Sequence, residues 1–167
     1  MKKIVLGVCL LCTLGACRSS QKVNNEVVKE FQLERFLGTW YEIARYDHRF
    51  ERGMHHTMAF YSIDHNGNLR VVNTGIKDGK EKVAEGKGKS TEVPALMRVS
   101  FFGPFYADYR VLLLDEDYSY ALIGSGNSRY LWLLSRSPVI SDGVLDTMLQ
   151  EASVRGYNVN DLIWVKH

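Results

Sequence analysis

The chain has 167 residues, and its 21 lysine and arginine residues nearly balance its 19 aspartate and glutamate residues. This balance excludes the strongly basic surface by which proteins bind nucleic acid. All three cysteines, Cys9, Cys12 and Cys17, lie at the start of the chain, so the rest of it can form neither a disulfide nor a cysteine-ligated metal centre.

Residues 1–16 have the pattern of a secretory signal peptide. Two lysines supply a positive start, residues 4–14 form an apolar run, and two small residues follow, as a signal peptidase requires. The run is too short to span a bilayer, which takes roughly 20 apolar residues. Cys17 comes next, and this arrangement resembles bacterial lipoprotein signals, in which that cysteine carries acyl chains such as palmitate and becomes the new N-terminus. The alternative is an ordinary signal peptide with a chance cysteine.

The polar stretch after Cys17 predicts a lipidated tether over residues 17–30. In lipoproteins of this type an aspartate after the cysteine often retains the protein in the inner membrane, and this chain has Arg18 there. By that resemblance we expect an anchor in the bacterial outer membrane. The remaining residues, 31–167, have the size of one domain.

From residue 38 to residue 135, short β-prone runs alternate with turn signals. The segment 64–67 and the pair 78–79 predict hairpin turns, and Pro94 and Pro104 end strands. The eight expected strands are 40–46, 57–63, 69–75, 82–89, 96–101, 108–114, 120–124 and 130–135. Eight strands at a spacing of roughly 8–12 residues favour an antiparallel sandwich or barrel.

After Pro138 the apolar residues recur at helical spacing. Ser141 predicts the N-cap of a helix, and Gly156 predicts its end. A single helix cannot form a layer of its own, so we expect it to pack on the outside of the sheet. Residues 162–165 are expected to form a last short strand or a packed tail.

Three motifs, in the expected order along the chain, resemble those of the lipocalins. Gly38-Thr39-Trp40 resembles the motif that opens their first strand, residues 115–118 resemble the turn between strands six and seven, and Arg136 resembles the arginine that ends strand eight. The runs 40–45 and 100–106 are similar to those of bacterial outer-membrane lipocalins in particular. The resemblance covers about residues 31–165. It implies an all-β fold, an eight-stranded antiparallel up-and-down barrel (the lipocalin calyx) with one C-terminal α-helix packed outside.

Strand direction in such a barrel predicts a closed end. The start of strand one, the turn between strands six and seven and the end of strand eight lie together there. The structural motif residues expected to converge are Gly38, Trp40, Asp115, Tyr118 and Arg136, with Phe31, Leu33, Phe36 and Leu37 as a plug. An arginine over an indole ring contributes about 0.5–2 kcal/mol. We therefore assign Trp40 and Arg136 to folding and not to ligand binding.

Alternation along the strands predicts which side chains enter the barrel. If Trp40 points inward, alternation also turns Glu42, Ala44 and Tyr46 inward. For the later strands, the inward residues are those that the resemblance to lipocalins implies. The expected ligand-binding residues are Ala44, Ala59, Tyr61, Val71, Asn73, Val99, Phe101, Val111, Leu113, Ala121, Ile123, Trp132 and Leu134. Most are apolar, so we expect a mostly apolar ligand. A buried Glu42 needs a partner or a proton, unless the strand bulges and exposes it, and a one-residue slip would invert every assignment on a strand.

The remaining loops, near 47–56, 76–80, 102–107 and 124–129, are expected to gather at the open end. The predicted mouth residues are Arg45, Arg49, Arg52, Phe102, Phe105 and Tyr106, a cationic and aromatic rim that suits an amphiphile with an acidic head. The charges have the alternative of a solvated loop. The aromatics have the alternatives of lid packing, a membrane contact or a homodimer, and the stiff loop at Pro104 slightly favours the dimer.

The sequence contains no pattern for catalysis or for a metal. The five histidines have no ligand spacing, and His55 and His56, adjacent in an extended segment, are expected to turn their rings to opposite faces. A nucleophile elbow and a glycine-rich phosphate loop are also missing. We therefore expect no enzyme activity, no metal and no cofactor.

The resulting hypothesis is an acyl-anchored outer-membrane lipocalin that binds a fatty acid or lysophospholipid. Its expected role is lipid storage or transport in envelope maintenance, and this role follows from the resemblance alone. The expected partners are that lipid, the outer membrane through the N-terminal anchor, and a possible homodimer. Two other classes remain open: a structural or interaction lipoprotein with a filled barrel, and a weak lipid-acting enzyme.

Overall fold

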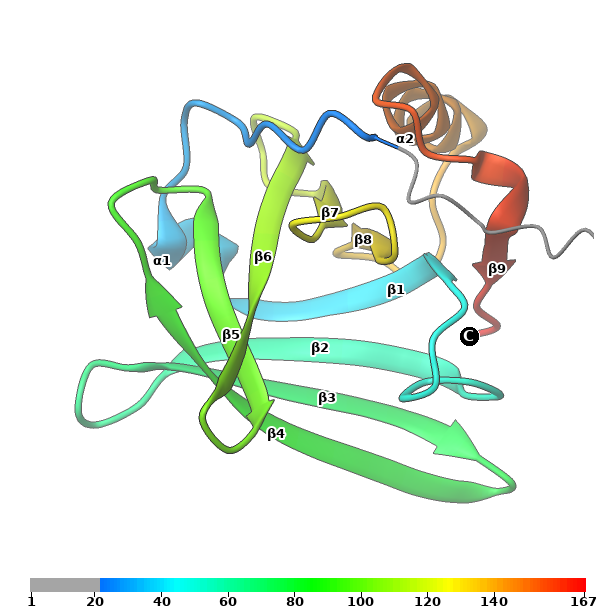
Figure 1. The fold of residues 1–167 in the computed structure, drawn as a ribbon. Helices are drawn as coiled ribbons and strands as arrows, with labels where there is room; N and C mark the ends of the chain where they lie inside the picture. Colours follow the sequence, from blue (N-terminus) through cyan, green and yellow to red (C-terminus); the bar gives the residue numbers. More distant parts are fainter. Residues whose placement is uncertain (1–21) are drawn as a thin grey trace, which may run out of the picture.

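A computed structural model describes residues 22–167, and in it eight antiparallel strands form a closed barrel (Figure 1). The strands are β1 (Gly38–Tyr46), β2 (His55–Ile63), β3 (Leu69–Lys77), β4 (Lys80–Ser90), β5 (Leu96–Phe102), β6 (Phe105–Leu114), β7 (Tyr120–Gly124) and β8 (Leu131–Ser135). Each pairs with the next in the chain, and β1 pairs with both β2 and β8, which closes the sheet. The predicted barrel is thus confirmed. The largest difference is that β6 begins at Phe105, three residues before its expected start.

The predicted outer helix is also confirmed as α2 (Asp142–Val154). The Ser141 hydroxyl accepts a hydrogen bond from the backbone N–H of Val144, which caps the helix. Gly156 ends it with a φ of 90°, a conformation that favours glycine. The buried side of α2 packs against the outer face of the barrel, in a second apolar cluster with residues such as Leu112 and Leu133.

Shorter elements lie before the first barrel strand and after the outer helix. A single helical turn, α1 (Leu33–Phe36), precedes β1 at the closed end. After α2 come a 3₁₀ turn, η1 (Val159–Asp161), and a short strand, β9 (Leu162–Trp164), which pairs with the second half of β1. No helix in residues 22–167 is both long and apolar enough to cross a bilayer.

The β3–β4 hairpin extends beyond the barrel wall. Its two-residue turn, Asp78-Gly79, has positive φ at both positions, 53° and 68°, as a tight hairpin turn requires. β5 pairs with β4 only at residues 87–90, so the first half of β4 has no partner on that side among residues 22–167. The hairpin therefore projects from the open end of the barrel (Figure 1).

The segment before α1 lies against the barrel. The backbone N–H of Val28 donates to the carbonyl of Val111 at 2.9 Å, and that of Asn24 donates to the carbonyl of Arg155 at 2.8 Å. Val27 and Val28 pack against the interior cluster at its edge. From residue 22 onward, the segment predicted as a tether is thus part of the packed domain.

Candidate ligand-binding site

The barrel interior is lined by one apolar cluster that contains most of the residues expected to bind the ligand. The members of the cluster that were predicted are Ala59, Tyr61, Val71, Val99, Phe101, Val111, Ala121, Ile123, Trp132 and Leu134. Asn73 is on the same face of the sheet, because it lies opposite Ala59 in the β2–β3 register. The predicted alternation of inward and outward side chains is therefore found on every strand except β1 and β6.

On β1 the predicted phase is wrong beyond Glu42. The register with β8 shifts between Glu42 and Ala44, so one extra residue is inserted in β1. The bulge turns Ile43 and Ala44 together toward the helix, where they pack in the outer cluster. Ala44 is thus not a lining residue, and Arg45 points into the barrel in its place.

On β6 a second bulge has the same effect. The register with β7 shifts between Val111 and Leu113. Leu113 packs in the outer cluster with the helix, while Leu114 packs in the interior cluster. Leu113 is therefore also wrong as a predicted lining residue.

Aromatic side chains form the floor of the interior. The hydroxyls of Tyr61 and Tyr109 lie 2.8 Å apart, and burial raises the pKa of both tyrosines above the usual range. The Phe36 ring lies 5.3 Å from that of Tyr61 and 4.7 Å from that of Trp40, measured between ring centres. The plug expected before strand one thus closes the floor.

Beneath this floor the predicted structural motif residues meet, as strand direction indicated. The Trp40 side chain is fully buried, and its Nε1 donates to the carbonyl of Phe36 at 2.8 Å. The guanidinium carbon of Arg136 lies 4.0 Å from the centre of the Trp40 ring. The same guanidinium donates to three backbone carbonyls, those of Arg35, Thr39 and Tyr118.

The two other motif positions also lie at this end. The carboxylate of Asp115 accepts hydrogen bonds from the backbone N–H groups of Ser119 and Tyr120, which holds the turn between β6 and β7. Gly38 has a φ of 95°, and a side chain there would meet Arg136.

A buried polar cluster lies inside the barrel near the open end. Arg45, 1% exposed, donates from Nη1 to Glu42 Oε1 at 2.6 Å. Its Nη2 donates to the carbonyls of Glu51 and Met54 in the loop between β1 and β2. The prediction of Arg45 as a rim residue is therefore wrong, because the bulge in β1 turns it inward, where it holds that loop over the mouth.

Glu51 reaches down from the same loop into the barrel. Its Oε2 accepts a hydrogen bond from Trp132 Nε1 at 3.2 Å and lies 2.8 Å from His48 Nε2. Glu51 is thus held by side chains from β8 and from its own loop, and the loop covers one side of the mouth.

The pKa values of the two carboxyl groups in this cluster are shifted in opposite directions. Burial raises the pKa of Glu42 to about 8, with a further increase from the charge of Glu51 and an opposing effect of Arg45. Burial acts on Glu51 too, but its interactions with His48, Trp132 and Arg45 together outweigh burial and lower the pKa of Glu51. Glu42 therefore keeps its proton to a higher pH than Glu51 does, and Glu51 is the first of the two carboxyls to become a counter-charge for Arg45.

The rim itself is aromatic and exposed. Phe50 stacks on Phe102 with ring centres 5.5 Å apart, which connects the β1–β2 loop to the β5–β6 hairpin. The guanidinium of Arg49 lies 4.9 Å from the centre of the Phe50 ring. Phe102 and Phe105 are 62% and 79% exposed, as a rim residue must be. Phe50 is a rim residue that the predicted set lacks.

Two other predicted mouth residues have different surroundings. The side chain of Arg52 is exposed but paired with Asp47 at 2.7 Å. Tyr106 lies on the outer wall, where the ammonium group of Lys89 is 4.7 Å from its ring centre. Tyr106 is therefore not part of the mouth, because alternation along β6 turns it outward.

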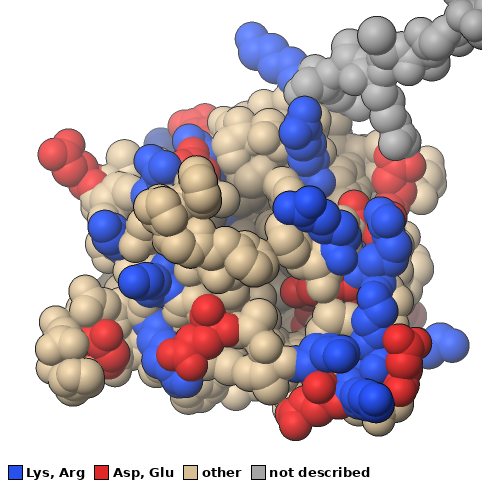
Figure 2. Space-filling view, turned by 60° about the horizontal axis from the view of Figure 1, so that its bottom comes forward, with Lys and Arg blue, Asp and Glu red and all other residues tan. Residues whose placement is uncertain are grey.

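Lysines on the β3–β4 hairpin complete the mouth and were not in the predicted set. Gly86 and Gly88 press against Phe101 and Leu69, so this face of β4 points inward, and Lys80 and Lys82 share it. Lys77 lies directly opposite Lys80. Figure 2 shows that the surface is hollowed here, with Lys and Arg gathered on the side to which the hairpin extends. Lys80 and Lys82 could have been predicted from the sequence, because they lie an even number of residues from Gly86 and Gly88 and so share their face of the strand.

The histidine prediction needs one correction. The Nδ1 atoms of His55 and His56 lie 2.6 Å apart, so the two rings meet instead of facing apart. His56 has a φ of 53°, and the β2–β3 register shifts at this point, which breaks the alternation. Within the described residues, no group of three or more histidine, cysteine or acidic side chains is placed to hold a metal ion.

Comparisons with known proteins agree with this architecture. Residues 31–167 match the family model described as a lipocalin-like domain. This chain belongs to the lipocalin family. Among solved structures, insecticyanin from the tobacco hornworm Manduca sexta matches this lipocalin with a TM-score of 0.69 and 23% identity, over 92% of this chain and 87% of that chain. At this identity the likeness shows the fold alone.

Two bacterial relatives are similar over most of their length. The outer membrane lipoprotein Blc of Citrobacter freundii is 49% identical over 144 residues, which cover 84% of this chain and 81% of the relative. The protein of the same name from Vibrio cholerae is 40% identical over 171 residues, 99% of both chains. This lipocalin is accordingly an outer-membrane lipoprotein, as its signal sequence predicted. Cys17 lies outside the described residues, and its acylation stays a prediction.

Proposed function

We propose that this lipocalin binds one single-chain amphiphile, a fatty acid or a lysophospholipid, and does not catalyse a reaction. The acyl chain enters the barrel, and the anionic head group stays at the open end. Carrying or storing such a lipid at the outer membrane is a role in envelope maintenance.

One observation carries this proposal. Several apolar side chains point into the closed barrel yet remain partly exposed to solvent, among them Ala59, Phe101 and Trp132. A packed interior would leave no such surface. Water therefore reaches an apolar lining, and an acyl chain that replaced this water would be stabilised by about 0.8 kcal/mol per buried CH₂.

The mouth supplies groups for the head. Lys77, Lys80 and Lys82 form no ion pair within the described residues, and like charges placed directly opposite each other repel. A carboxylate or phosphate between them would relieve that repulsion and accept charge-assisted hydrogen bonds. The deeper Arg45 is held by Glu42 and its own loop, so we assign the head group to the lysines.

A tryptophan at position 59 is expected to weaken binding. Ala59→Trp would occupy the space of the acyl chain, and we expect an affinity loss of about 1–3 kcal/mol, roughly 5- to 150-fold. Titration of delipidated protein with a fluorescent fatty acid measures it, and Phe60→Trp, on the outer face of the same strand, is the control. Ala121 is fully buried, so Ala121→Trp is the harsher variant. Equal affinities of Ala59→Trp and Phe60→Trp would contradict the proposal.

The anchor has its own test. Cys17→Ala is expected to move the protein from the membrane fraction to the soluble fraction, because each CH₂ of a buried acyl chain contributes about 0.8 kcal/mol to anchoring. Cell fractionation measures this, with Cys12→Ala inside the apolar run as the control that keeps its anchor. A Cys17→Ala protein that stayed tightly membrane-bound would rule out the single-anchor interpretation.

A further inference from the structure

We propose that the open end of this barrel docks onto an anionic phospholipid surface, so that the ligand passes between membrane and barrel without crossing water. The inference rests on the proposed lipid anchor and goes beyond the proposed binding. Three features of the described residues carry it: the place where the chain reaches the barrel, the exposed aromatics of the rim, and the distribution of charge between the two ends.

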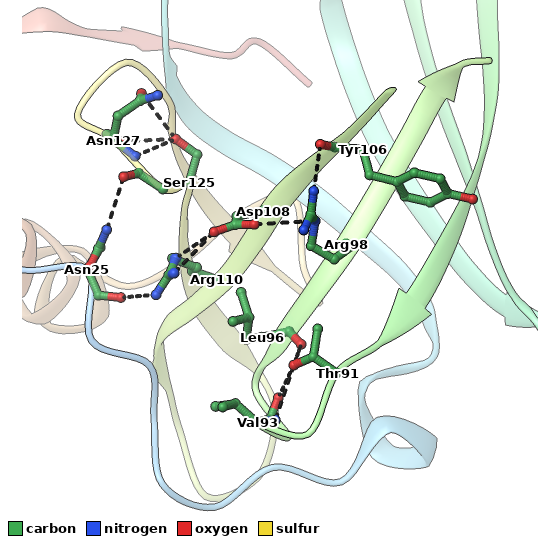
Figure 3. A network of polar contacts seen from close by, with 11 residues as sticks. Asn25, Thr91, Val93, Leu96, Arg98, Tyr106, Asp108, Arg110, Ser125 and Asn127 are labelled. Atoms are coloured by element: carbon green, nitrogen blue, oxygen red, sulfur yellow. Dashed lines mark hydrogen bonds and ion pairs between the residues drawn. The ribbon is translucent and has the colours of Figure 1, made fainter. Parts of the chain in front are cut away.

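The N-terminal segment reaches the barrel at its open end. The side-chain amide of Asn25 donates to the carbonyl of Gly126 in the β7–β8 loop, and the backbone carbonyl of Asn25 accepts from the guanidinium of Arg110 (Figure 3). Asp108 pairs with this arginine and with Arg98, which fixes the attachment to β5 and β6 (Figure 3). From there the chain runs along β6 to α1 at the closed end.

The distance from the anchor to this point is short. Lys22, the first described residue, lies beside Gly156, just after the outer helix. Only residues 18–21 separate it from Cys17, and five steps of at most about 3.6 Å allow about 18 Å. An acylated Cys17 therefore keeps the open end close to the bilayer that holds its acyl chains.

The rim offers a surface suited to a bilayer interface. Phe50, Phe102 and Phe105 are 47%, 62% and 79% exposed, and two of them are stacked on each other across neighbouring loops. Exposed phenylalanine rings of this kind are stabilised when they bury their apolar area at the boundary between lipid head groups and acyl chains. Pro104, between the last two, fixes one backbone φ angle in the hairpin turn.

Charge distinguishes the two ends of the barrel. The open-end segments 47–54, 77–82, 102–106 and 125–130 contain six basic and four acidic residues. One of the four acids, Glu51, is withdrawn into the barrel. The closed-end segments 29–37, 64–68, 91–95, 115–119 and 136–141 contain three basic and seven acidic residues. An anionic membrane therefore attracts the open end and repels the closed end, although the chain as a whole is nearly neutral.

The test compares tryptophan reporters at the two ends of the reconstituted lipoprotein. Phe105→Trp places the reporter on the rim, and Val139→Trp places it at the closed end at matched exposure, 79% against 78%. Vesicles contain phosphatidylethanolamine and phosphatidylglycerol with brominated acyl chains, which quench tryptophans near the bilayer, and wild-type fluorescence is subtracted. We expect a loss of fluorescence for Phe105→Trp and none for Val139→Trp. Equal quenching, or more quenching at position 139, overturns the inference.

The charge argument has a matched pair of variants on one strand. Lys80→Gln with Lys82→Gln removes two lysines from the inner face of β4, whereas Lys87→Gln with Lys89→Gln removes two from its outer face. In the Phe105→Trp background we expect the inner pair to lower the docked fraction, by roughly fivefold per lysine in the docking equilibrium, and the outer pair to leave it unchanged. Quenching that is the same for both pairs overturns the electrostatic part of the docking.

Other outcomes identify other occupants of the rim. Unquenched Phe105→Trp, together with a sedimenting dimer that Phe105→Ser splits, would assign the rim to a second copy of the chain and overturn membrane docking. A lipoprotein that does not associate with vesicles at all would overturn the anchor on which the inference rests. Fatty-acid affinity of Ala59→Trp is measured separately, so failure of docking and failure of binding are distinguished.

Discussion

Trp40→Ala is expected to lower the free energy of unfolding by about 3–5 kcal/mol, the usual loss for a large aromatic side chain removed from a packed site. The Trp40 side chain is fully buried, stacked on Phe36 and covered on its other side by Arg136. Denaturant unfolding measures the loss. Trp164→Ala, at a tryptophan that is 51% exposed, is the control and should change stability by less than about 1 kcal/mol.

The same variant separates folding from binding. Trp40 is fully buried beneath the aromatic floor and far from the mouth, although it lies directly opposite the lining residue Ala59 in the β1–β2 register. Folded Trp40→Ala protein should therefore bind a fluorescent fatty acid with nearly the wild-type affinity. An unchanged melting temperature together with lost binding would reverse the assignment of this end as structural.

The barrel and its closed end could be predicted from the sequence. Turn residues indicate where each hairpin lies, and the alternating direction of the strands then determines which segments meet at each end. Asp78-Gly79 determines a hairpin wherever it stands between two strands. Strand parity then places the first motif, the β6–β7 turn and Arg136 at the same end, and the structure brings Trp40 and Arg136 to 4.0 Å. Neither step depends on how the side chains pack.

The lining residues were harder to predict because a bulge adds one residue without changing composition. In Leu112-Leu113-Leu114 every residue is apolar, so nothing in the sequence marks where the phase changes. On β1 there was a signal, since the adjacent apolar residues Ile43 and Ala44 can both face the helix while their polar neighbours turn inward. When a helix is expected to cover the outside of a strand, two adjacent apolar residues in that strand therefore indicate a possible bulge.

The partners of Arg45 could not be predicted at all from the sequence. Glu51 enters the barrel only because its loop folds back over the mouth, and a loop's path is not encoded in a periodic pattern. Its contacts with His48 and Trp132 join residues up to 81 positions apart. The sequence did predict that Glu42 would need a partner or a proton, and the buried cluster provides both.

Arg45→Met is the second variant with a large expected effect. It leaves Glu51 without its buried counter-charge and frees the carbonyls of the β1–β2 loop that Arg45 holds. Breaking a buried pair on one side costs about 3–5 kcal/mol. Urea unfolding at several pH values measures the loss. Arg52→Met is the control, because Arg52 is exposed and its pair with Asp47 contributes at most about 1 kcal/mol.

The pH dependence of stability identifies which carboxylate is responsible. The pKa of Glu42 is raised from 4.5 to about 8 in the folded protein, so folding is favoured when this group is protonated. Its contribution is fully present below pH 4.5 and is lost as the pH rises toward 8. The lowered pKa of Glu51 acts in the opposite direction, since its contribution is lost as the pH falls below 4.5. Wild-type stability should therefore decline between pH 5 and pH 8, and Glu42→Gln should remove that decline.

The double variant completes the test. In Arg45→Met the pKa of Glu42 should rise further, because the guanidinium that lowers it is gone. The loss should therefore be greatest at pH 8, where folding must keep the buried carboxyl protonated, and adding Glu42→Gln should restore part of the stability there and little at pH 5. This pattern requires that the two side chains share one buried site, as their 2.6 Å contact indicates. If Arg45→Met were as stable as the wild type at pH 8, the cluster would not hold the loop over the mouth, and the loop would owe its position to the Phe50–Phe102 stack alone.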